Sequence, residues 1–292
     1  MPDDAMLARR ALARRQRQAW LAHAALLLGV LVFAFPIWIT LVGSTHDAAT
    51  IGRGEVPLLP GGHGLENFAI ALGEGGGRMH TSPAAGMLLN SAIMALLIAG
   101  GKIAISLLSA YAVVFFRFPL RMAAFWTIFI TLMLPVEVRI IPTYQVIVDL
   151  NLFNTYTGLT LPLIASATAT LLFRQFFLTI PDEYVEAAKM DGAGPLRFFR
   201  DILLPLSVTN IAALGVIRFI YGWNQYLWPL LIINDRSMET IVVGLAKMIG
   251  GGDSQNEWNT IMATAVLAMT PPVLVVVLLQ RWFIKGLTET EK

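Results

Sequence analysis

The amino-acid sequence predicts an all-α membrane protein with six transmembrane helices. Hydrophobic residues make up 56% of the 292 residues and charged residues only 14%, whereas a soluble domain usually contains about 25% charged residues. A helix of about 20 mainly apolar residues crosses a hydrocarbon core about 30 Å thick, and it satisfies its own backbone hydrogen bonds there. Six segments meet this length and composition. The predicted spans are 20–43, 87–114, 122–148, 158–178, 207–233 and 261–283.

The first predicted span follows a basic tail, 1–19, which contains five arginines. A cleaved signal peptide is the alternative interpretation of this pattern. The apolar stretch is longer than a typical signal-peptide core, however, and no A-x-A-like cleavage site closes it. We therefore expect the tail to be followed by one membrane domain, 20–292, whose first span stays in place as an anchor.

The distribution of Lys and Arg predicts the orientation of the spans. Of the 21 Lys and Arg residues, 14 lie in the tail and connections on one side of the predicted membrane and 4 on the other. Loops rich in Lys and Arg stay in the cytoplasm. Both termini and the loop 179–206 are therefore predicted to be cytoplasmic, and the loops 44–86 and 234–260 to lie outside.

Neither outer loop carries a recognisable chemical site. The chain contains no cysteine, which excludes disulfides and thiolate metal ligands. The first outer loop has three scattered histidines, His46, His63 and His80, without paired carboxylates, so we predict no metal site. The second contains three consecutive glycines, which permit a tight or mobile tip because glycine accepts backbone angles that other residues avoid. These glycines are Gly250, Gly251 and Gly252.

Two features inside the spans concern packing and shape. Ser91, Ala95 and Ala99 recur every four residues, and small residues at this spacing let helices approach closely in lipid. Pro135 and Pro142 interrupt the third span, and each removes a helical hydrogen bond and favours a kink.

The loop 179–206 is unusually polar for this chain, since residues 186–207 read EAAKMDGAGPLRFFRDILLPLS. Pro181 suits the first position of a helix, Gly192 and Gly194 are expected to break that helix, and Pro195 is expected to begin another that ends at Pro205. The pattern predicts two short helices joined by a glycine elbow, held outside the lipid. One interpretation is an amphipathic connector resting on the headgroups, and the other is a docking element for a second protein.

The spacing E-A-A-x3-G-x9-I-x-L-P in this loop resembles the EAA loop in the membrane subunits of binding-protein-dependent ABC importers, of the maltose-type carbohydrate uptake group. The resemblance implies a type I ABC importer permease fold in which the loop forms a coupling helix inserted in a cleft of a separate ATPase. The residues implied to couple to the ATPase are Glu186, Ala187, Ala188, Asp191, Gly192, Ile202, Leu204 and Pro205.

Four further stretches resemble the permeases of glycerol-3-phosphate importers that pair with a second, different permease. They are FRFPLR (116–121), ITLMLPVEVRIIP (130–142), LTLPLIASATATLLFRQFF (159–177) and FIYGWNQYLWPLLII (219–233). The resemblance implies uptake of sn-glycerol-3-phosphate or of glycerophosphodiesters such as glycerophosphocholine, with a maltose-type sugar as the alternative cargo. It implies four kinds of partner: the second permease, two copies of the ATPase, an extracytoplasmic solute-binding protein, and the lipid of a bacterial inner membrane. Nucleic acid is not among them.

The chain has no phosphate-binding loop of its own. Such a loop reads G-x-x-x-x-G-K-[ST]. At the nearest candidate, Gly101–Lys102, Leu96 replaces the first glycine and Ile103 follows the lysine. We therefore expect the chain to be a non-catalytic subunit without a cofactor, and ATP and Mg to be bound by the partner ATPase.

Arg218 lies near the middle of the fifth predicted span, where a cation usually faces a bundle interior or a wet cavity. Arg218, Tyr221, Gly222 and Gln225 share one helix face by their spacing. One hypothesis is that this face and Asn224 line a translocation path in which Arg218 meets an anionic phosphate. The alternative is that Arg218 pairs with a carboxylate or backbone carbonyls of the sister subunit.

Other polar and aromatic residues of the spans are assigned to the edges of the membrane. Glu137 and Arg139 are placed near the outer interface by counting along the third span, which suggests a gate or an intersubunit contact. Lys102 is expected to extend toward the cytoplasmic face. Trp228 is expected to border the path near its outer end or, with Trp223 and Tyr226, to belong to an interfacial aromatic belt.

The resemblance implies that ATP-driven closure of the ATPase dimer acts on the segment 183–205 and rocks the two permeases between inward-open and outward-open states. Gly250, Gly251 and Gly252 resemble in position the loop of maltose-type permeases that enters the binding protein. An ion-coupled secondary transporter is the rival, but it would need intramembrane acids, and Glu137 is the one carboxylate in the predicted spans. A channel is a third interpretation, for which no ring-forming selectivity sequence is visible.

Overall fold

The computed structural model describes residues 2–55, 57–73, 82–133, 136–249 and 257–288, with the backbone alone for 2–14, 131–132, 136–137 and 281–288. The described residues form helices and loops without a strand. The longer helices are α1 (Pro2–Gly43), α4 (Ala84–Phe115), α5 (Arg121–Met133), α6 (Val136–Asp149), α8 (Ala167–Phe177), α12 (Val208–Trp223) and α15 (Trp258–Thr288). The shorter ones are α2 (Ala48–Gly52), α3 (Gly64–Gly73), α7 (Tyr156–Thr160), η2 (Leu161–Leu163), α9 (Asp182–Met190), α10 (Pro195–Phe198), η3 (Phe199–Leu203), α11 (Leu204–Leu206), α13 (Leu227–Ile232), η4 (Arg236–Met238) and α14 (Ile241–Ile249).

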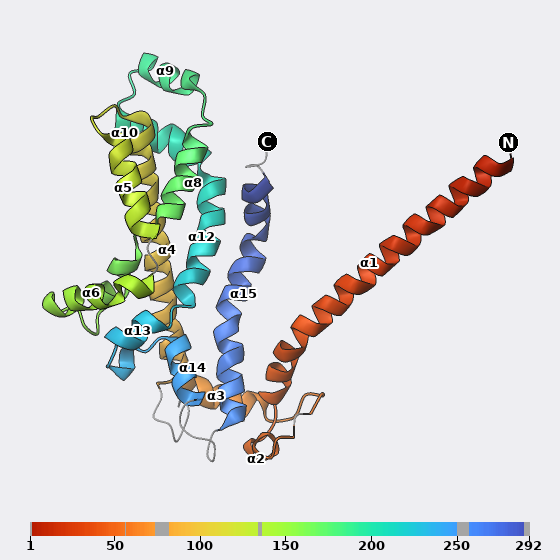
Figure 1. Cartoon of the computed structure of the whole chain (residues 1–292). Helices are drawn as coiled ribbons and strands as arrows, with labels where there is room; N and C mark the ends of the chain where they lie inside the picture. The colour runs from red at the N-terminus through yellow and green to blue at the C-terminus, as the bar shows by residue number, and fades with distance from the viewer. Residues whose placement is uncertain (1, 56, 74–81, 134–135, 250–256, 289–292) are drawn as a thin grey trace.

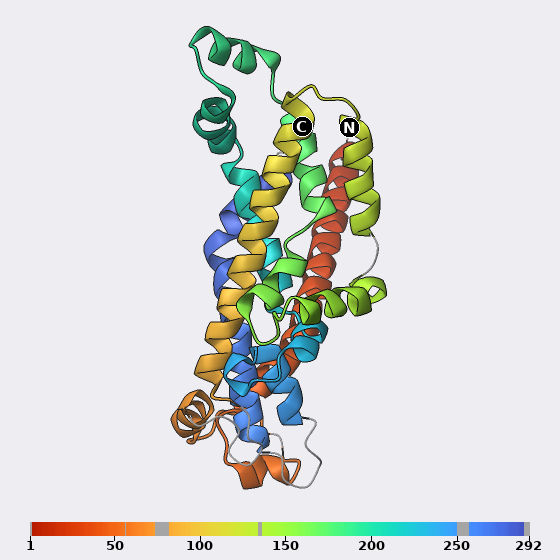
Figure 2. The same ribbon diagram turned by 90° about the vertical axis from the view of Figure 1, so that its left-hand side faces the viewer.

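The centre of the bundle is α4, which packs against α8 and α12, while α12 also packs against α15 (Figures 1 and 2). Small residues allow the close approach of α4 and α12, as their spacing predicted. Ser91, Ala95 and Ala99 are buried, and a Cβ atom added to Gly222 would lie 2.9 Å from the Ala95 Cα atom. Glycine at 222 therefore sets the separation of these two helices.

The first helix, α1, leans away from the other helices in Figure 1 and contacts α15. It runs unbroken from Pro2 to Gly43, so the predicted boundary between residues 19 and 20 does not divide it. Many of its apolar side chains are largely exposed, including Phe33 at 79%. Exposed apolar surface of this extent suits a helix whose surroundings are lipid or other protein.

The third predicted span, 122–148, which Pro135 and Pro142 were expected to interrupt, does not form a single helix. This stretch forms two helices, α5 and α6, and α6 lies across the bundle at about mid-height in both ribbon views (Figures 1 and 2). Pro135 falls between them, outside the described residues, and Pro142 lies inside α6. The residues of α6 therefore do not continue along the axis of α5.

The predicted count of six spans is also not matched in the described part of the chain. Three helices are long and apolar enough to cross a membrane, and the number rises to five if each of two bent pairs counts as one span. One pair joins 156–163 to α8 with a bend of 53°, and the other joins 195–206 to α12 with a bend of 71°. The predicted fifth span, 207–233, is shorter than expected, since α12 ends at Trp223 and α13 follows as a separate helix.

Two tryptophans near this break are buried, so the alternative of an interfacial belt is wrong for them. Trp223 and Trp228 are each 2% exposed. The Trp223 indole N–H donates to the Ala268 carbonyl at 3.1 Å, and that of Trp228 donates to the Gly158 carbonyl at 3.1 Å. These bonds tie the lower end of α12 and the start of α13 to neighbouring helices.

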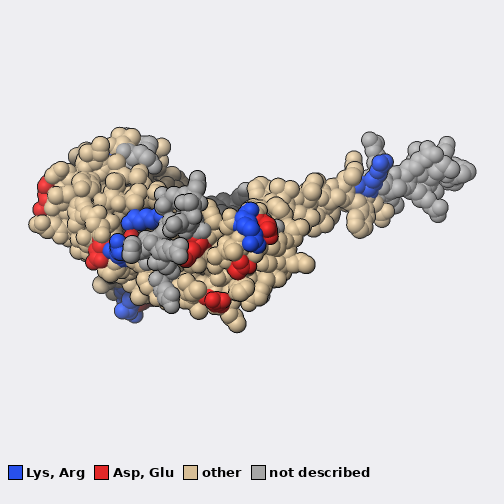
Figure 3. All heavy atoms as spheres, turned by 90° about the horizontal axis from the view of Figure 1, so that it is seen from below, with Lys and Arg blue, Asp and Glu red and all other residues tan. Residues whose placement is uncertain are grey.

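The end of the molecule opposite α9 is built from short helices and loops. Asn90 of α4 organises it, because its amide donates to the carbonyls of Ser237 and Glu239 and its oxygen accepts from the Tyr156 hydroxyl. Asp47 caps α2, and the Thr50 hydroxyl bound to it lowers its pKa to about 2. Figure 3 looks onto this end and shows acidic and basic side chains interspersed on its visible surface.

Candidate functional site

The segment 179–206 stands at one end of the molecule. Its first helix, α9, projects beyond the tips of α5 and α8, and α1 begins and α15 ends at the same end (Figures 1 and 2). Pro181 is the residue before the helix and has an extended backbone, with φ −61° and ψ 143°. It therefore precedes the first helical position, which is Asp182, one residue later than predicted.

The predicted glycine elbow follows α9 and is confirmed at Gly192. Asp191 ends the helix, and its N–H donates to the Ala187 carbonyl at 3.0 Å. Gly192 has a φ of +70°, in the left-handed region that favours glycine. The next residue, Ala193, donates its N–H back to the Ala188 carbonyl at 2.8 Å. The chain reverses direction there and begins α10 at Pro195, as predicted.

The alanines of the E-A-A sequence face in different directions. Glu186 and Ala187 are exposed, whereas Ala188 is 4% exposed and belongs to an apolar cluster with Phe177 and Phe198. The ATPase-coupling role expected for the two alanines stays a prediction. Ala187 lies on the open surface, and Ala188 packs α9 onto the rest of its own chain.

An aromatic cluster fastens this segment to the end of α4. The Tyr111 hydroxyl donates to the Pro195 carbonyl at 2.8 Å. Its ring centroid lies 5.0 Å from that of Phe199, and the Phe115 ring lies 5.3 Å from Phe198 and 5.9 Å from Phe177. Ring pairs at these distances add to the stability gained from area burial. These contacts therefore join α10 and η3 to the end of α4.

The same segment continues into α12 through an irregular turn. Residues 199–203 form a π-helical turn, η3, and Pro205 has no N–H to donate to the Asp201 carbonyl, which a regular helix would require. Ile202 and Leu204 are half-buried and Pro205 is exposed. Ser207 is fully buried and its hydroxyl donates to the Leu203 carbonyl. The bend of 71° follows at this point.

Charged side chains on this segment are exposed and paired with one another. Asp201 accepts from Arg200 Nε at 2.7 Å and lies 3.5 Å from Arg197 Nε. The two arginine side chains are 74% and 68% exposed. Charges of this kind cost little because water or a partner protein solvates them.

The interior of the bundle contains a second group of charges. Lys102 of α4 is only 5% exposed, and its Nζ lies 3.8 Å from the centroid of the Tyr221 ring on α12. Arg218 lies one turn before Tyr221, and its Nε is buried without a hydrogen-bond partner. The prediction that Lys102 extends toward the cytoplasmic face is wrong, because the Tyr221 ring holds its ammonium group between α4 and α12.

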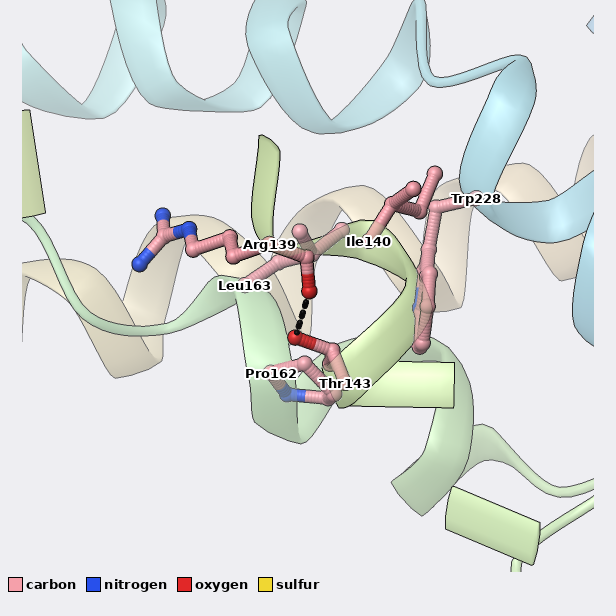
Figure 4. A pocket seen from close by; sticks show the side chains of 6 residues that line it. All are labelled: Arg139, Ile140, Thr143, Pro162, Leu163 and Trp228. Atoms are coloured by element: carbon pink, nitrogen blue, oxygen red, sulfur yellow. Dashed lines mark hydrogen bonds between the residues drawn. The ribbon is translucent and has the colours of Figure 1, made fainter. Parts of the chain in front are cut away.

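Arg139 belongs to the same region and lines a small hollow between α6, η2 and α13. The other lining residues are Ile140, Thr143, Pro162, Leu163 and Trp228. Figure 4 shows the Arg139 guanidinium pointing away from the Trp228 ring, while the Thr143 hydroxyl donates to the Arg139 carbonyl at 2.8 Å. Arg139 is near enough to Lys102 to repel it electrostatically. The role expected for Arg139 near the outer interface, at a gate or an intersubunit contact, stays a prediction.

The remaining predicted path residues are only partly brought together. Gln225 donates its amide to the Tyr221 carbonyl at 3.1 Å, so it stays on the predicted face. Asn224 is exposed at the end of α12. Glu137 has a described backbone within α6 but no described side chain.

The loop predicted to contact the binding protein is not part of the described chain. Gly250, Gly251 and Gly252 all lie outside the described residues, so the role expected for each of them stays a prediction. No group of three His, Asp or Glu side chains capable of holding a metal occurs in the described residues.

Sequence reasoning missed the contacts of two residues of these sites. Tyr111 looks like one more apolar residue at the end of a span, and only the fold shows its hydroxyl meeting Pro195, 84 positions later. Lys102 does carry a signal in the sequence, since it lies in the middle third of the helix Ala84–Phe115. That central position argues against a long reach to either interface.

Comparison with known proteins identifies the family. The model of the family described as "Binding-protein-dependent transport system inner membrane component" matches residues 102–289. The sn-glycerol-3-phosphate transport system permease protein UgpE of Rhizobium meliloti (strain 1021) is 61% identical over 272 residues, covering 93% of this chain and 96% of its own. UgpE of Agrobacterium fabrum gives the same figures. UgpE of Pectobacterium atrosepticum is 55% identical over 271 residues, with coverage of 93% and 96%.

A solved structure supports the fold. The chain is similar to a chain from the crystal structure of a bacterial ABC transporter involved in the import of the acidic polysaccharide alginate. The TM-score is 0.78, the sequence identity is 22%, and the match covers 92% of this chain and 98% of the other. Over nearly its whole length the chain therefore has the fold of an ABC importer permease, with three to five candidate spans among the described residues.

Proposed function

Because the chain belongs to the family of binding-protein-dependent transport system inner membrane components, we propose that it is the permease subunit of an ATP-driven importer of sn-glycerol-3-phosphate. Glycerophosphodiesters such as glycerophosphocholine are included in the proposed cargo. The single observation that carries this assignment is the identity of 55–61% to sn-glycerol-3-phosphate permeases over 93% of the chain. Hydrolysis of ATP belongs to a separate subunit, where ATP and Mg are bound.

The segment 179–206 is the proposed contact with that ATPase. Glu186, Ala187 and Asp191 offer an exposed polar surface on α9, and Gly192 gives the turn that holds α9 away from the bundle. Ala188, Ile202 and Leu204 support the contact from the inner side of the segment, and Pro205 lies at its exposed end, before the bend into α12. Movement of α9 then reaches α4 through Tyr111 and α12 through the bend at Ser207.

The proposed assembly contains a second, homologous permease, two ATPase copies and an extracytoplasmic binding protein. Both chain termini and α9 face the cytoplasm in this proposal. The common position of α9, the start of α1 and the end of α15 supports this orientation (Figure 1). The large exposed apolar area of α1 supports a position in lipid or against the second permease.

The translocation path is proposed to pass along α12 and α6. Arg218, Tyr221, Asn224 and Gln225 line it on the face of α12 and just beyond its end. Glu137 and Arg139 line it on α6, where a gate near the outer interface or an intersubunit contact is the alternative role. The proposed contact with the binding protein, on the opposite side of the membrane, is made by Gly250, Gly251 and Gly252.

Reconstitution of the complete complex tests the proposal. The chain should co-purify with an ATPase and a second permease, and vanadate-sensitive ATP hydrolysis in proteoliposomes should rise on addition of binding protein with sn-glycerol-3-phosphate. A panel with glycerophosphocholine and maltose separates the cargo classes. Uptake by the chain alone, driven by a proton gradient, would refute the proposal, and stimulation by maltose only would refute the cargo.

A further inference from the structure

Three cations from distant parts of the sequence meet inside the bundle. Lys102 on α4 has its Nζ 3.8 Å from the centroid of the Tyr221 ring on α12, and Arg218, with a buried Nε, lies one turn before that tyrosine. Arg139 on α6 lines the neighbouring hollow beside Trp228 and is within electrostatic range of Lys102. Of the 21 Lys and Arg residues, these three are the ones that lie deep within the predicted spans, away from the tail and connections. An intramembrane cation is costly unless it faces a partner or a wet cavity, so three together require a compensating negative charge.

The described residues do not supply that charge. The ion pairs among them join other residues, in the outer loops and on the segment 179–206. The Tyr221 ring offers Lys102 a cation–π contact at 3.8 Å, which offsets part of the cost for one cation. Arg218 Nε has no hydrogen-bond partner.

Glu137 cannot balance the group by itself, whatever the position of its side chain. It is the single carboxylate in the predicted spans. One carboxylate offsets one of three cations and leaves a surplus of two positive charges, so the imbalance follows from composition as well as from geometry.

We propose that Lys102, Arg139 and Arg218, with Tyr221, form an anion subsite that holds the phosphate of a phosphomonoester during its passage. The proposal rests on the proposed function and names the part of the cargo that this chain binds. A phosphomonoester carries close to two negative charges at neutral pH, which matches the surplus. The planar guanidinium donors of arginine and the ammonium of lysine are the groups that proteins use to bind phosphate.

The arrangement also explains why the subsite is shared among helices. Lys102, Arg218 and Arg139 lie on α4, α12 and α6, and α4 and α12 are the two helices to which the segment 179–206 is joined, through Tyr111 and Ser207. A movement of that segment changes the spacing of the cations. The subsite therefore weakens when the helices separate, as release of the cargo requires.

Selectivity between a monoester and a diester tests the subsite. The complete importer is reconstituted in vesicles of phosphatidylcholine alone, and uptake of sn-glycerol-3-phosphate is compared with uptake of glycerophosphocholine, whose diester carries one negative charge. We expect Lys102→Gln and Arg218→Gln to reduce monoester uptake about tenfold, since a charge-assisted contact is lost. Diester uptake should fall by only about twofold, because one charge needs fewer cations.

Three controls make the test decisive. Arg174→Gln removes another cation with a buried, unpartnered Nε, which lies over the Phe125 ring at 4.9 Å, and it should leave the monoester-to-diester ratio unchanged. Arg218→Lys and Lys102→Arg keep the charge and should retain the ratio within about threefold. Thermal stability and co-purification of the other subunits report on folding and assembly of each variant.

The outcomes separate the subsite from the proposed function. If the wild-type complex does not take up sn-glycerol-3-phosphate, the proposed function fails. If it does, but Lys102→Gln and Arg218→Gln lower the uptake of both cargoes equally or of neither, the subsite is overturned. The cations would then contact the sister subunit or stabilise the fold. The uptake is then repeated in vesicles that contain phosphatidylglycerol, to test whether a lipid phosphate occupies the subsite. If this lipid inhibits uptake by the wild type but not by the Gln variants, the ligand is a lipid and the assignment of the subsite to cargo is overturned.

Discussion

The segment 179–206 and the interior cation group, which consists of Lys102, Arg139 and Arg218, both contain clustered charges. The charges of the segment are exposed to solvent, whereas those of the group lie inside the bundle. On the segment, Arg197 and Arg200 are mostly exposed and share Asp201. In the interior, Lys102 is 5% exposed and no described carboxylate pairs with it. Exposed charges cost little to maintain, whereas buried ones are kept only when something offsets them. This contrast agrees with the proposed roles, in which the segment contacts the ATPase and the interior cations bind a small anion.

The two regions also differ in the contacts that fix their positions. The segment depends on one glycine turn and one aromatic cluster, so a single backbone change can misplace all of it. The interior group depends on helix separation, which Gly222 sets through its contact with Ala95. Substitutions at these points measure how independent the two regions are.

The largest effect is expected for Gly192→Val. A φ of +70° is strained for a β-branched residue by about 1–3 kcal/mol, so the elbow would open and α9 would lose its angle. We expect ligand-stimulated ATP hydrolysis by the reconstituted complex to fall more than about tenfold, while the membrane domain stays folded. Gly194→Ala is the matched control, because Gly194 has a φ of −70° and open space around it. Normal ligand stimulation of ATP hydrolysis in Gly192→Val would contradict the proposed contact between α9 and the ATPase.

Gly222→Ala is expected to have the next largest effect, on the interior region alone. The new Cβ would meet the Ala95 backbone at 2.9 Å, and overpacking of this kind costs about 1–3 kcal/mol. The melting temperature in detergent should fall, and uptake should fall with it because Lys102 and Arg218 move apart. Gly215→Ala on the same helix should be near neutral, since its Cβ would meet only the Ile103 side chain, at 3.8 Å. Equal melting temperatures for the two variants would contradict this account of α4–α12 packing.

Much of the fold and the outline of the segment 179–206 were predictable from the sequence, because both depend on local signals. Long apolar segments indicate helices that lie in lipid, and Gly192 and Pro195 indicate the positions at which the chain turns. The direction of the chain after a break was not predictable. Pro135 and Pro142 indicated kinks in 122–148, but nothing in their spacing indicated that α6 would lie at a steep angle to α5. The meeting of Lys102, Arg139 and Arg218 depends on the packing of three helices, which no local pattern reports.

A smaller effect is expected for Tyr111→Phe, which tests whether the two regions communicate through α4. The substitution removes the hydrogen bond to the Pro195 carbonyl, worth about 0.5–1.5 kcal/mol, and keeps the ring contacts with Phe198 and Phe199. We expect the amount of cargo taken up per ATP hydrolysed to fall a few-fold, with assembly intact. Tyr226→Phe, at an exposed position, is the control. Unchanged uptake per ATP would show that the hydroxyl contributes nothing to the transmission of movement.

The smallest effect is expected for Asp201→Asn, which tests the charge comparison directly. The substitution breaks the pairs with Arg197 and Arg200, but all three side chains are exposed and water replaces the lost contacts. Surface pairs of this kind contribute little, so ATP-driven uptake should stay within about twofold of the wild type. A loss of uptake comparable to that expected for Arg218→Gln would mean that these charges make contacts that water cannot replace, for example in the ATPase interface. The distinction between the two regions would then no longer hold.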